Sequence, residues 1–353
     1  MRFYKLLHRI LDLVEIYLKR SKSGWLILSG FSLILFRPIS VVFEFRSGDT
    51  EILGSIYSLK PPIFIDAIQI VVGLSLIISG LYMAIKTHMA MSRKRVIAVE
   101  LRGLNQTVDS SLEEAIPRRV FGYRDPILID VRDLIKEKAL EMTNQLPARF
   151  RQAKDGRDRS DLTLYAGGLA PVPLLFLAGS FIAAESKTHW MDWDRSKQKW
   201  TLIEEGVDCG NLTWPIIDGL NGDEVVLAMS ISYPIDKTEL LSAFPDTEIL
   251  EAGLEQPFPG RVMSEECTHR VLNEFLKFIV TLQNQGVRRV HLAIAASSAL
   301  SMRLGSFYSR RNMPELIVYQ YQKGQIDNPY PWGVIMPGSE EEMGKIHNNL
   351  IPA

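Results

Sequence analysis

Two turns rich in small residues are the positions where this sequence is best suited to bind an anion. The first, residues 167–171 (GGLAP), follows an apolar run and precedes a predicted helix, and the second, residues 295–298 (AASS), does the same. Small residues at the start of a helix let backbone N–H groups approach a phosphate closely. Tight packing of strand against helix is the alternative explanation for either turn alone.

The familiar catalytic and cofactor motifs are missing from the sequence. It contains no G-x-x-x-x-G-K-[ST] loop, no G-x-G-x-x-G after a predicted strand and no G-x-S-x-G elbow. The six histidines never occur at metal-ligand spacing, and His291 lies inside an apolar run, where core histidines are common. We therefore predict no enzymatic activity, no catalytic residue, no metal and no cofactor.

The two cysteines, Cys209 and Cys267, are far apart in the sequence and outside any C-x-x-C spacing. We interpret both as unpaired structural residues of a protein in a reducing compartment. The charge is also balanced, with 40 basic and 41 acidic residues and a net charge of −1. Proteins that bind long nucleic acids usually carry a basic excess, so we expect no polymeric nucleic acid as partner.

Beyond about residue 92, short apolar runs alternate with helical stretches. The predicted strands are residues 96–101, 126–130, 161–168, 224–232, 247–250, 290–296 and 315–321. The predicted helices are residues 131–152, 171–184, 264–285 and 298–310. This alternation predicts an α/β domain over residues 93–353 with a mostly parallel, doubly wound sheet. Ligands of such sheets bind beyond the carboxyl ends of the strands, where both turns lie.

An internal repeat appears when residues 163–194 are laid without gaps on residues 289–320. The identical pairs are Ala170/Ala296, Leu174/Leu300, Gly179/Gly305, Ser180/Ser306 and Phe181/Phe307. An apolar strand, a small-residue turn, a helix and a second strand thus occur twice. We predict two fused α/β halves, about 93–206 and 220–340, that form a pseudo-dimer and share one quasi-symmetric ligand.

The first ninety residues contain two apolar stretches. Residues 25–43 and 63–85 are each close to the ~20 residues with which a helix crosses ~30 Å of hydrocarbon, so we predict transmembrane helices at 24–43 and 62–86. The first stretch lacks the cleavage site of a signal peptide. Residues 1–20 have apolar positions at helical spacing, which predicts an amphipathic helix on the membrane surface or against a neighbour.

Flanking charge predicts the orientation of these helices. Lys19, Arg20 and Lys22 precede the first stretch, and basic residues from Lys86 to Arg95 follow the second. By the positive-inside rule both termini are cytoplasmic.

Polar residues within the two stretches are candidates for lining a pore. They are Arg37, Asp66 and Gln69. Arg37 and Asp66 alternatively extend to the outer membrane interface, as long polar side chains do. Gly73, Ser75, Ser79 and Gly80 are small enough to let helices pack closely. Two helices cannot enclose a pore, so a pore requires a homo-oligomer.

Residues 287–337 resemble the SAVED domain of bacterial antiphage signalling systems. The shared pattern is a VHL strand, a small-residue turn, a helix carrying LG, a VYQY strand and a closing strand that contains Tyr-Pro. SAVED domains resemble two fused CARF-like (Rossmann-like) halves and sense cyclic oligonucleotides from a partner nucleotidyltransferase. With two transmembrane helices, the arrangement resembles membrane effectors of CBASS systems. The resemblance implies a cyclic di- or trinucleotide ligand in the cleft between the halves, and the bacterial inner membrane as location.

The family has no invariant motif from which to transfer site residues, so we predict the ligand-binding residues by position, in the loops after the predicted strands. They are Arg102, Gly103, Gly167, Gly168, Leu169, Trp193, Arg195, Tyr233, Ser297, Ser298, Tyr321 and Lys323. Aromatic rings stack on bases, and Arg or Lys side chains meet phosphates. Trp193 is equally well explained as a core residue.

The function implied by the whole sequence is a cyclic-oligonucleotide-sensing membrane effector. Ligand binding would rearrange an oligomer and open or disrupt the membrane, as an ion channel that prefers anions if Arg37 lines it. A membrane-anchored enzyme and a passive nucleotide-binding relay are the alternatives.

Overall fold

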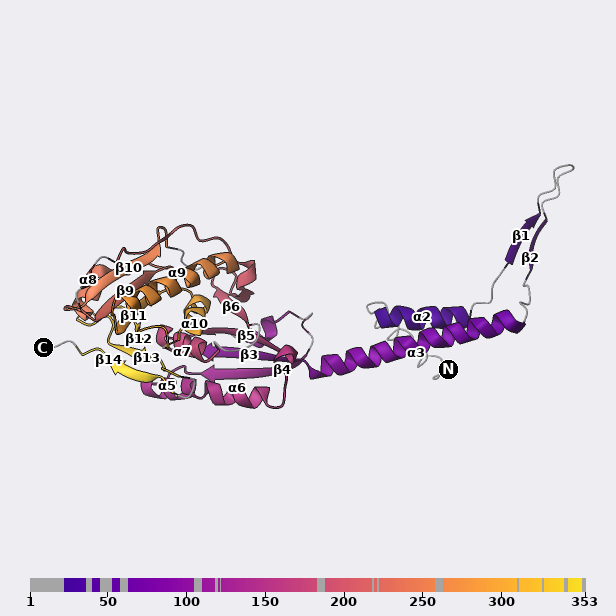
Figure 1. Cartoon of the computed structure of the whole chain (residues 1–353), viewed down its shortest axis with the longest axis horizontal. Helices are drawn as coiled ribbons and strands as arrows, with labels where there is room; N and C mark the ends of the chain where they lie inside the picture. The colour runs from indigo at the N-terminus through magenta and orange to yellow at the C-terminus, as the bar shows by residue number, and fades with distance from the viewer. Residues whose placement is uncertain are drawn as a thin grey trace. The chain divides into compact units, whose positions relative to one another are not determined.

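The computed structural model describes most of the chain. The described residues are 22–35, 40–44, 53–57, 63–104, 110–117, 120, 122–182, 188–217, 219–220, 222–257, 263–309, 311–325, 327–339 and 342–350. They form two compact units, Met1–Arg93 and Lys94–Ala353, which are described separately (Figure 1). The predicted amphipathic helix 1–20 and Arg37 lie outside the described residues.

The N-terminal unit contains two helices and a β-hairpin. Helix α2 (Lys22–Leu35) packs against α3 (Ile63–Arg93), and β1 (Ser40–Glu44) pairs antiparallel with β2 (Leu53–Tyr57). The prediction of one helix over residues 24–43 is therefore wrong in its last part, where residues 40–44 form a strand. The sequence explains the difference: Pro38 has no backbone N–H for a helix interior, and the β-branched residues of SVVF favour a strand.

Helix α3 has the length and composition of a transmembrane helix. Its segment Ala67–Met89 covers 23 residues with a mean hydropathy of 2.2, and it is the one such helix among the described residues. Helix α2 has 14 residues, which at ~1.5 Å per residue span only about 21 Å. Large apolar side chains, including Val71, Ile78 and Tyr82, are exposed on α3, as expected of a surface in contact with lipid.

Glycines allow α2 and α3 to approach closely. A β-carbon at Gly30 would lie 2.6 Å from the carbonyl oxygen of Gly73, and one at Gly80 would lie 2.9 Å from that of Ser23. The prediction of helix contacts at Gly73 and Gly80 is confirmed. Ser75 and Ser79, predicted to join them, are exposed, because they fall on other faces of the helix.

The C-terminal unit is built from two sheets. The first has the order β4-β3-β5-β6-β7, with β3 (Arg95–Arg102), β4 (Tyr123–Asp130), β5 (Leu162–Leu169), β6 (Thr188–Asp194) and β7 (Lys199–Leu202). The second has the order β14-β13-β12-β11-β9-β10-β8. Its strands are β8 (Leu212–Thr213), β9 (Glu224–Ser230), β10 (Glu248–Leu254), β11 (Arg289–Ala295), β12 (Glu315–Gln320), β13 (Trp332–Ile335) and β14 (Lys345–Asn348).

Helices connect the strands of both sheets. They are α4 (Leu112–Ala115), α5 (Lys136–Asn144), α6 (Leu146–Lys154), α7 (Val172–Ile182), α8 (Lys237–Ala243), α9 (Glu265–Asn284) and α10 (Ser298–Ser306). The predicted helix 131–152 is two helices that meet at Gln145, and Pro147 lies in the first turn of the second one. Proline is favoured there, because N–H groups in the first turn of a helix have no hydrogen-bond acceptor within the helix, so the missing N–H of proline costs nothing.

The two sheets repeat one topology, as the internal repeat predicted. In the first half β3, β4, β5 and β6 are parallel and β7 is antiparallel. In the second half β9, β10, β11 and β12 are parallel and β13 is antiparallel. Strand order within the halves is the same, and β8 and β14 extend the second sheet. The predicted α/β fold with two fused halves is confirmed.

Helices α7 and α10 form the contact between the halves (Figure 1). Each packs on the other half's sheet: α7 on β12 and β13, and α10 on β5 and β6. One large cluster of buried apolar side chains runs through both halves, and each half also has a smaller cluster of its own. The two halves therefore share the largest part of their core.

The prediction that the cysteines are unpaired is wrong. Cys209 and Cys267 form a disulfide, and their Cα atoms are 6.0 Å apart. Sequence spacing alone did not reveal the pair, because 58 positions separate the two cysteines. They come together only when the link between the halves, residues 203–211 between β7 and β8, packs on α9.

Candidate ligand-binding site

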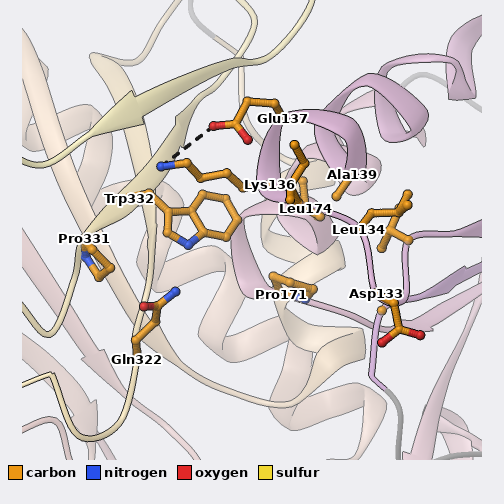
Figure 2. Close-up of a pocket in the computed structure, with 13 residues that line it drawn as sticks. Asp133, Leu134, Lys136, Glu137, Ala139, Pro171, Leu174, Gln322, Pro331 and Trp332 are labelled. Carbon is orange, nitrogen blue, oxygen red and sulfur yellow. Dashed lines mark ion pairs between the residues drawn. The ribbon is translucent and has the colours of Figure 1, made fainter.

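A cavity of about 510 Å³ lies at the carboxyl ends of β3, β4 and β5. The first half contributes the residues that follow these strands, and the second half contributes the opposite wall (Figure 2). The lining residues are Gly103, Val131, Asp133, Leu134, Ile135, Lys136, Glu137, Ala139, Pro171, Leu174, Gln322, Pro331 and Trp332. This volume is within the ~300–1,000 Å³ typical of small-molecule sites.

Gly103 lines the cavity where β3 and β5 end. Its backbone N–H donates to the carbonyl of Leu169 at 2.6 Å. A β-carbon there would lie 2.8 Å from Cβ of Ala170 and 2.9 Å from Cδ of Pro171. Strand order reverses between β3 and β5, and such switch points are where doubly wound sheets bind ligands.

Helix α5 begins at the cavity. Its N-cap residue, Ile135, makes no side-chain capping bond, and the first N–H groups of a helix attract anions. Ile135 is also 70% exposed, although it is a large apolar residue. The first residue of the helix, Lys136, adds a positive charge at the cavity wall.

Residues from both halves meet around Lys136. Its ammonium group donates to Oδ1 of Asn348 on β14 at 2.6 Å and lies 3.9 Å from a carboxylate oxygen of Glu137. The indole ring of Trp332 lies beside it, with Gln322 below (Figure 2). The cavity thus combines the carboxylates of Asp133 and Glu137 with an aromatic ring, an amide and a cation, and the last three are groups that recognise bases and phosphates.

The N-terminus of α7, which also opens at the cavity, is already capped. The backbone N–H of Val172 donates to Oε1 of Gln320 at 3.0 Å, so β12 of the second half supplies the cap. The α5 end is therefore the better candidate for a phosphate.

Two ion pairs stand near the ends of β3 and β4. The guanidinium of Arg102 binds the buried carboxylate of Glu100, which also accepts from Leu112 N at 2.9 Å. The hydrogen bond that Arg102 donates to Glu100 raises the pKa of Arg102. Arg132 pairs with Asp130 at 2.5 Å and lowers the pKa of that carboxyl. Arg102, a predicted phosphate contact, is thus bound to Glu100 in this structure.

Of the predicted ligand residues, only Gly103 lines the cavity. Gly167, Gly168 and Leu169 are buried inside β5, and the turn begins at Ala170. A β-carbon at Gly167 would lie 2.5 Å from the carbonyl oxygen of Met191, and one at Gly168 would lie 2.8 Å from that of Leu101. The two glycines are needed for close packing, which was the alternative interpretation of this turn.

The other predicted residues lie at strand ends elsewhere in the unit. Trp193 is half-buried and meets the ring of Trp200 edge-on at 5.5 Å, while Arg195 is exposed in the turn after β6. Tyr233 follows β9 and is exposed. Tyr321 and Lys323 follow β12, where the Tyr321 hydroxyl donates to Glu239 at 3.1 Å. Their role in binding stays a prediction.

The second small-residue turn, residues 295–298, is hydrogen-bonded to a carboxylate of the protein itself. Ser297 is the N-cap of α10 and Ser298 its first residue. The side chain of Asp192, on β6 of the first half, accepts from Ala299 N at 3.4 Å and is hydrogen-bonded to Ser297. Burial raises the pKa of Asp192, and these hydrogen bonds oppose the rise. An acidic residue between Met191 and Trp193 was the sequence signal for this contact.

Lys136 and Trp332 were missed because neither lies at the end of a predicted strand, and Gln322 was passed over between the predicted residues Tyr321 and Lys323. Lys136 fell inside the helix predicted from 131, and Trp332 in a strand whose partner was unknown. The usable signal was a cation a few residues after the apolar run 126–130, within the segment that follows a predicted strand.

Of the predicted pore residues, Gln69 has a described side chain. Its amide donates to the backbone carbonyl of Leu33 on α2, so it links the two helices. Asp66 lies in α3, with its side chain outside the described residues, as is the whole of Arg37.

The comparisons with known families agree with this architecture. The model of the SAVED domain, described as the SMODS-associated and fused to various effectors sensor domain, matches residues 146–336. A second model, the SAVED-fused 2TM effector domain, matches residues 4–146. The chain belongs to the SAVED family, with an effector domain of the two-transmembrane class at its N-terminus. The two models meet at residue 146, the first residue of α6, whereas the structure divides at Arg93.

Solved structures of Cap4 SAVED/CARF-domain containing receptors are similar to this chain. The Acinetobacter baumannii receptor with the cyclic trinucleotide 2'3'3'-cAAA is 11% identical, with a TM-score of 0.47, over 77% of this chain and 58% of that one. The Moraxella osloensis receptor is 10% identical, with a TM-score of 0.43, over 71% and 52%. The chain thus spans less than two thirds of these receptors. No curated protein sequence matches it.

Proposed function

We propose that this chain is a receptor for a cyclic di- or trinucleotide, bound in the cavity between the halves, and that the ligand acts on the membrane through α2 and α3. The observation that carries the proposal is the cavity itself, where the uncapped start of α5 and Lys136 of one half face Gln322 and Trp332 of the other. A ligand that touches both walls would change the free-energy balance between arrangements of the two halves.

Strand β3 offers a direct mechanical path from the cavity to the membrane helices. Gly103, at its carboxyl end, lines the cavity. At its amino end, Lys94 alone separates Arg95 of β3 from Arg93 of α3. This one-residue connection is the route by which we expect ligand binding at β3 to affect α3.

The proposed output is a change in the bacterial inner membrane, with both termini cytoplasmic. One chain supplies too few helices to enclose a pore, so the active species is a homo-oligomer whose arrangement depends on ligand. A cognate nucleotidyltransferase supplies the ligand, and the chain itself performs no catalysis. The exposed apolar side chains of α3 face lipid or neighbouring copies.

Calorimetry with the full chain in lipid nanodiscs tests the binding step. The panel comprises cyclic di- and trinucleotides and their linear counterparts. Lys136→Gln should weaken binding of the recognised member about tenfold, the effect of one charge-assisted hydrogen bond. Lys138→Gln is the matched control, because Lys138 lies on the same helix but is exposed and pairs with Glu141. No binding to any cyclic member would refute the proposal.

A further inference from the structure

The link between the halves is fastened to the start of α9. Val207 forms a parallel bridge with Met263, and Ser264 N donates to the carbonyl of Val207 at 2.8 Å. Gly206 passes so close to the backbone of Met263 that any side chain there would collide with it. The chain leaving the first half therefore lies directly on the second half.

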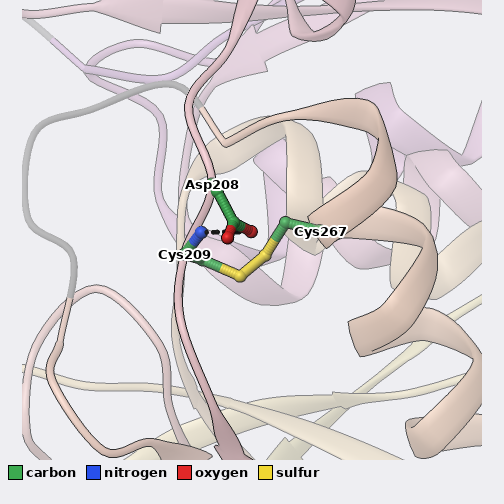
Figure 3. Close-up of side chains that lie close together, drawn as sticks. All are labelled: Asp208, Cys209 and Cys267. Carbon is green, nitrogen blue, oxygen red and sulfur yellow. Dashed lines mark hydrogen bonds between the residues drawn. A yellow bond between two sulfur atoms is a disulfide. The ribbon is translucent and has the colours of Figure 1, made fainter.

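A pair of cysteines joins the same two segments (Figure 3). Cys209 belongs to the link and Cys267 to the first turn of α9, and they form a disulfide. Cys267 is fully buried, whereas Cys209 is 6% exposed. Cys209 is thus the more exposed residue of this buried pair.

A guanidinium lies beside both sulfurs, where it can stabilise the thiolate form that exchange chemistry requires. Nη2 of Arg270 lies 3.4 Å from Sγ of Cys209 and 3.9 Å from Sγ of Cys267. Cys267 also lies at the N-terminus of a helix, whose dipole stabilises a negative sulfur. The carboxylates of Asp208, Glu265 and Glu266 oppose this effect, and Asp208 shares Arg270 at 3.3 Å.

A metal site is the competing explanation. Ligand atoms of Asp208, Cys209 and Cys267 lie within 4.8 Å of one another. The guanidinium of Arg270 sits beside the same three groups, and its positive charge would repel a metal cation. The geometry favours sulfur chemistry.

We propose that Cys209 and Cys267 are a reversible redox site that clamps the link between the halves onto α9, with Arg270 as its positioning and activating residue. In the reduced protein, the Cys209 thiolate attacks a low-molecular-weight disulfide and releases one small thiol. The Cys267 thiolate then attacks the Cys209 sulfur of the mixed disulfide and releases the second. The small disulfide is reduced to two thiols, and the protein loses two electrons and two protons.

Counting thiols in the full chain in nanodiscs tests the proposal, since it contains only two cysteines. The protein is reduced with dithiothreitol, freed of reagent and treated with oxidised glutathione, and a maleimide–polyethylene glycol reagent then labels the thiols after denaturation. Two labels are expected before oxidation and none after it, and reduction should restore both. Because a covalent clamp restricts the unfolded chain, the oxidised form should also melt about 5–10 °C higher.

Variants separate activation by Arg270 from a purely structural pair. Arg270→Gln should slow the reaction with glutathione several-fold and move its pH profile to higher pH, while Arg270→Lys should restore much of the rate. Lys277→Gln, farther along α9, is the control. Two free thiols after saturating glutathione, a disulfide that resists dithiothreitol in the folded protein, an unchanged Arg270→Gln rate, or thiols protected by Zn²⁺ without a disulfide would each overturn the proposal.

Discussion

Gly179 of α7 and Gly305 of α10 occupy equivalent positions of the internal repeat, and each lies against the backbone of the other's helix. Gly179 meets the carbonyl of Met302, and Gly305 meets that of Phe176. Phe176 and Met302 are themselves equivalent in the repeat, so the contact is isologous, as in a two-fold dimer. The cavity depends on this contact, because its walls come from the two halves that the helices hold together.

Alanine at either glycine should destabilise the protein. In an ordinary helix Gly→Ala stabilises by ~0.5–1 kcal/mol, but here the added methyl group has no room, and overpacking costs about 1–3 kcal/mol. Gly179→Ala and Gly305→Ala are therefore both expected to lower the free energy of unfolding, measured by denaturant titration. Ser180→Ala and Ser306→Ala, one residue further along, should change it by less than about 0.5 kcal/mol. Stabilisation by either glycine variant would contradict the close contact.

Asp192 should contribute to stability through the start of α10. Asp192→Ala leaves the N–H of Ala299 and the hydroxyl of Ser297 without this acceptor, at a cost of about 1–3 kcal/mol. The Asp192→Ala/Ser297→Ala double mutant should be destabilised by less than the sum of the single changes, because both remove the same hydrogen bond. Strict additivity in a thermal or denaturant titration would mean that the two residues do not interact.

Acidification should weaken the C-terminal unit through His291. Nδ1 of His291 contacts the Tyr319 hydroxyl at 2.8 Å and Nε2 contacts Glu224 at 3.1 Å. Burial lowers the pKa of His291 below its usual 6.5, and the same holds for His347. The unfolded chain then binds protons more readily, so stability should fall as the pH drops below 6.5.

His291→Gln should flatten this pH profile, followed as the midpoint of thermal unfolding. The exposed His269 provides the control, because its replacement by Gln should leave the slope unchanged. A wild-type profile that is flat between neutral pH and pH 5 would show that the burial of His291 has no effect on stability.

The sequence was sufficient to predict the fold of the C-terminal unit but not the composition of its site. The helix predicted at 264–285 is α9, which is capped by Ser264. The internal repeat correctly predicted two halves. Both predictions succeeded because periodicity and small-residue turns are local signals. Strand β1 was missed because a short apolar run such as SVVF is compatible with the end of a transmembrane helix as well as with a strand. Lys136 and Trp332 come together only through tertiary packing across the halves, which no local pattern encodes.

Arg37 should set ion preference if it lines the pore of the proposed oligomer. A ring of fixed positive charges favours anions. Arg37→Glu should then reduce or reverse the preference for anions in ligand-dependent flux from liposomes, while Arg37→Lys should retain it. Equal anion and cation flux in all three proteins would place Arg37 outside the conduction path.

Ligand-dependent leakage from liposomes tests the central claim most directly, that a nucleotide bound between the halves acts on the membrane. The full chain is inserted into dye-loaded vesicles, and the cyclic nucleotide selected by calorimetry is titrated in. We predict leakage that rises with occupancy, a shift of about tenfold to higher concentration for Lys136→Gln, and no shift for Lys138→Gln. Vesicles that stay intact at saturating ligand, with the protein inserted and ligand-bound, would contradict the account.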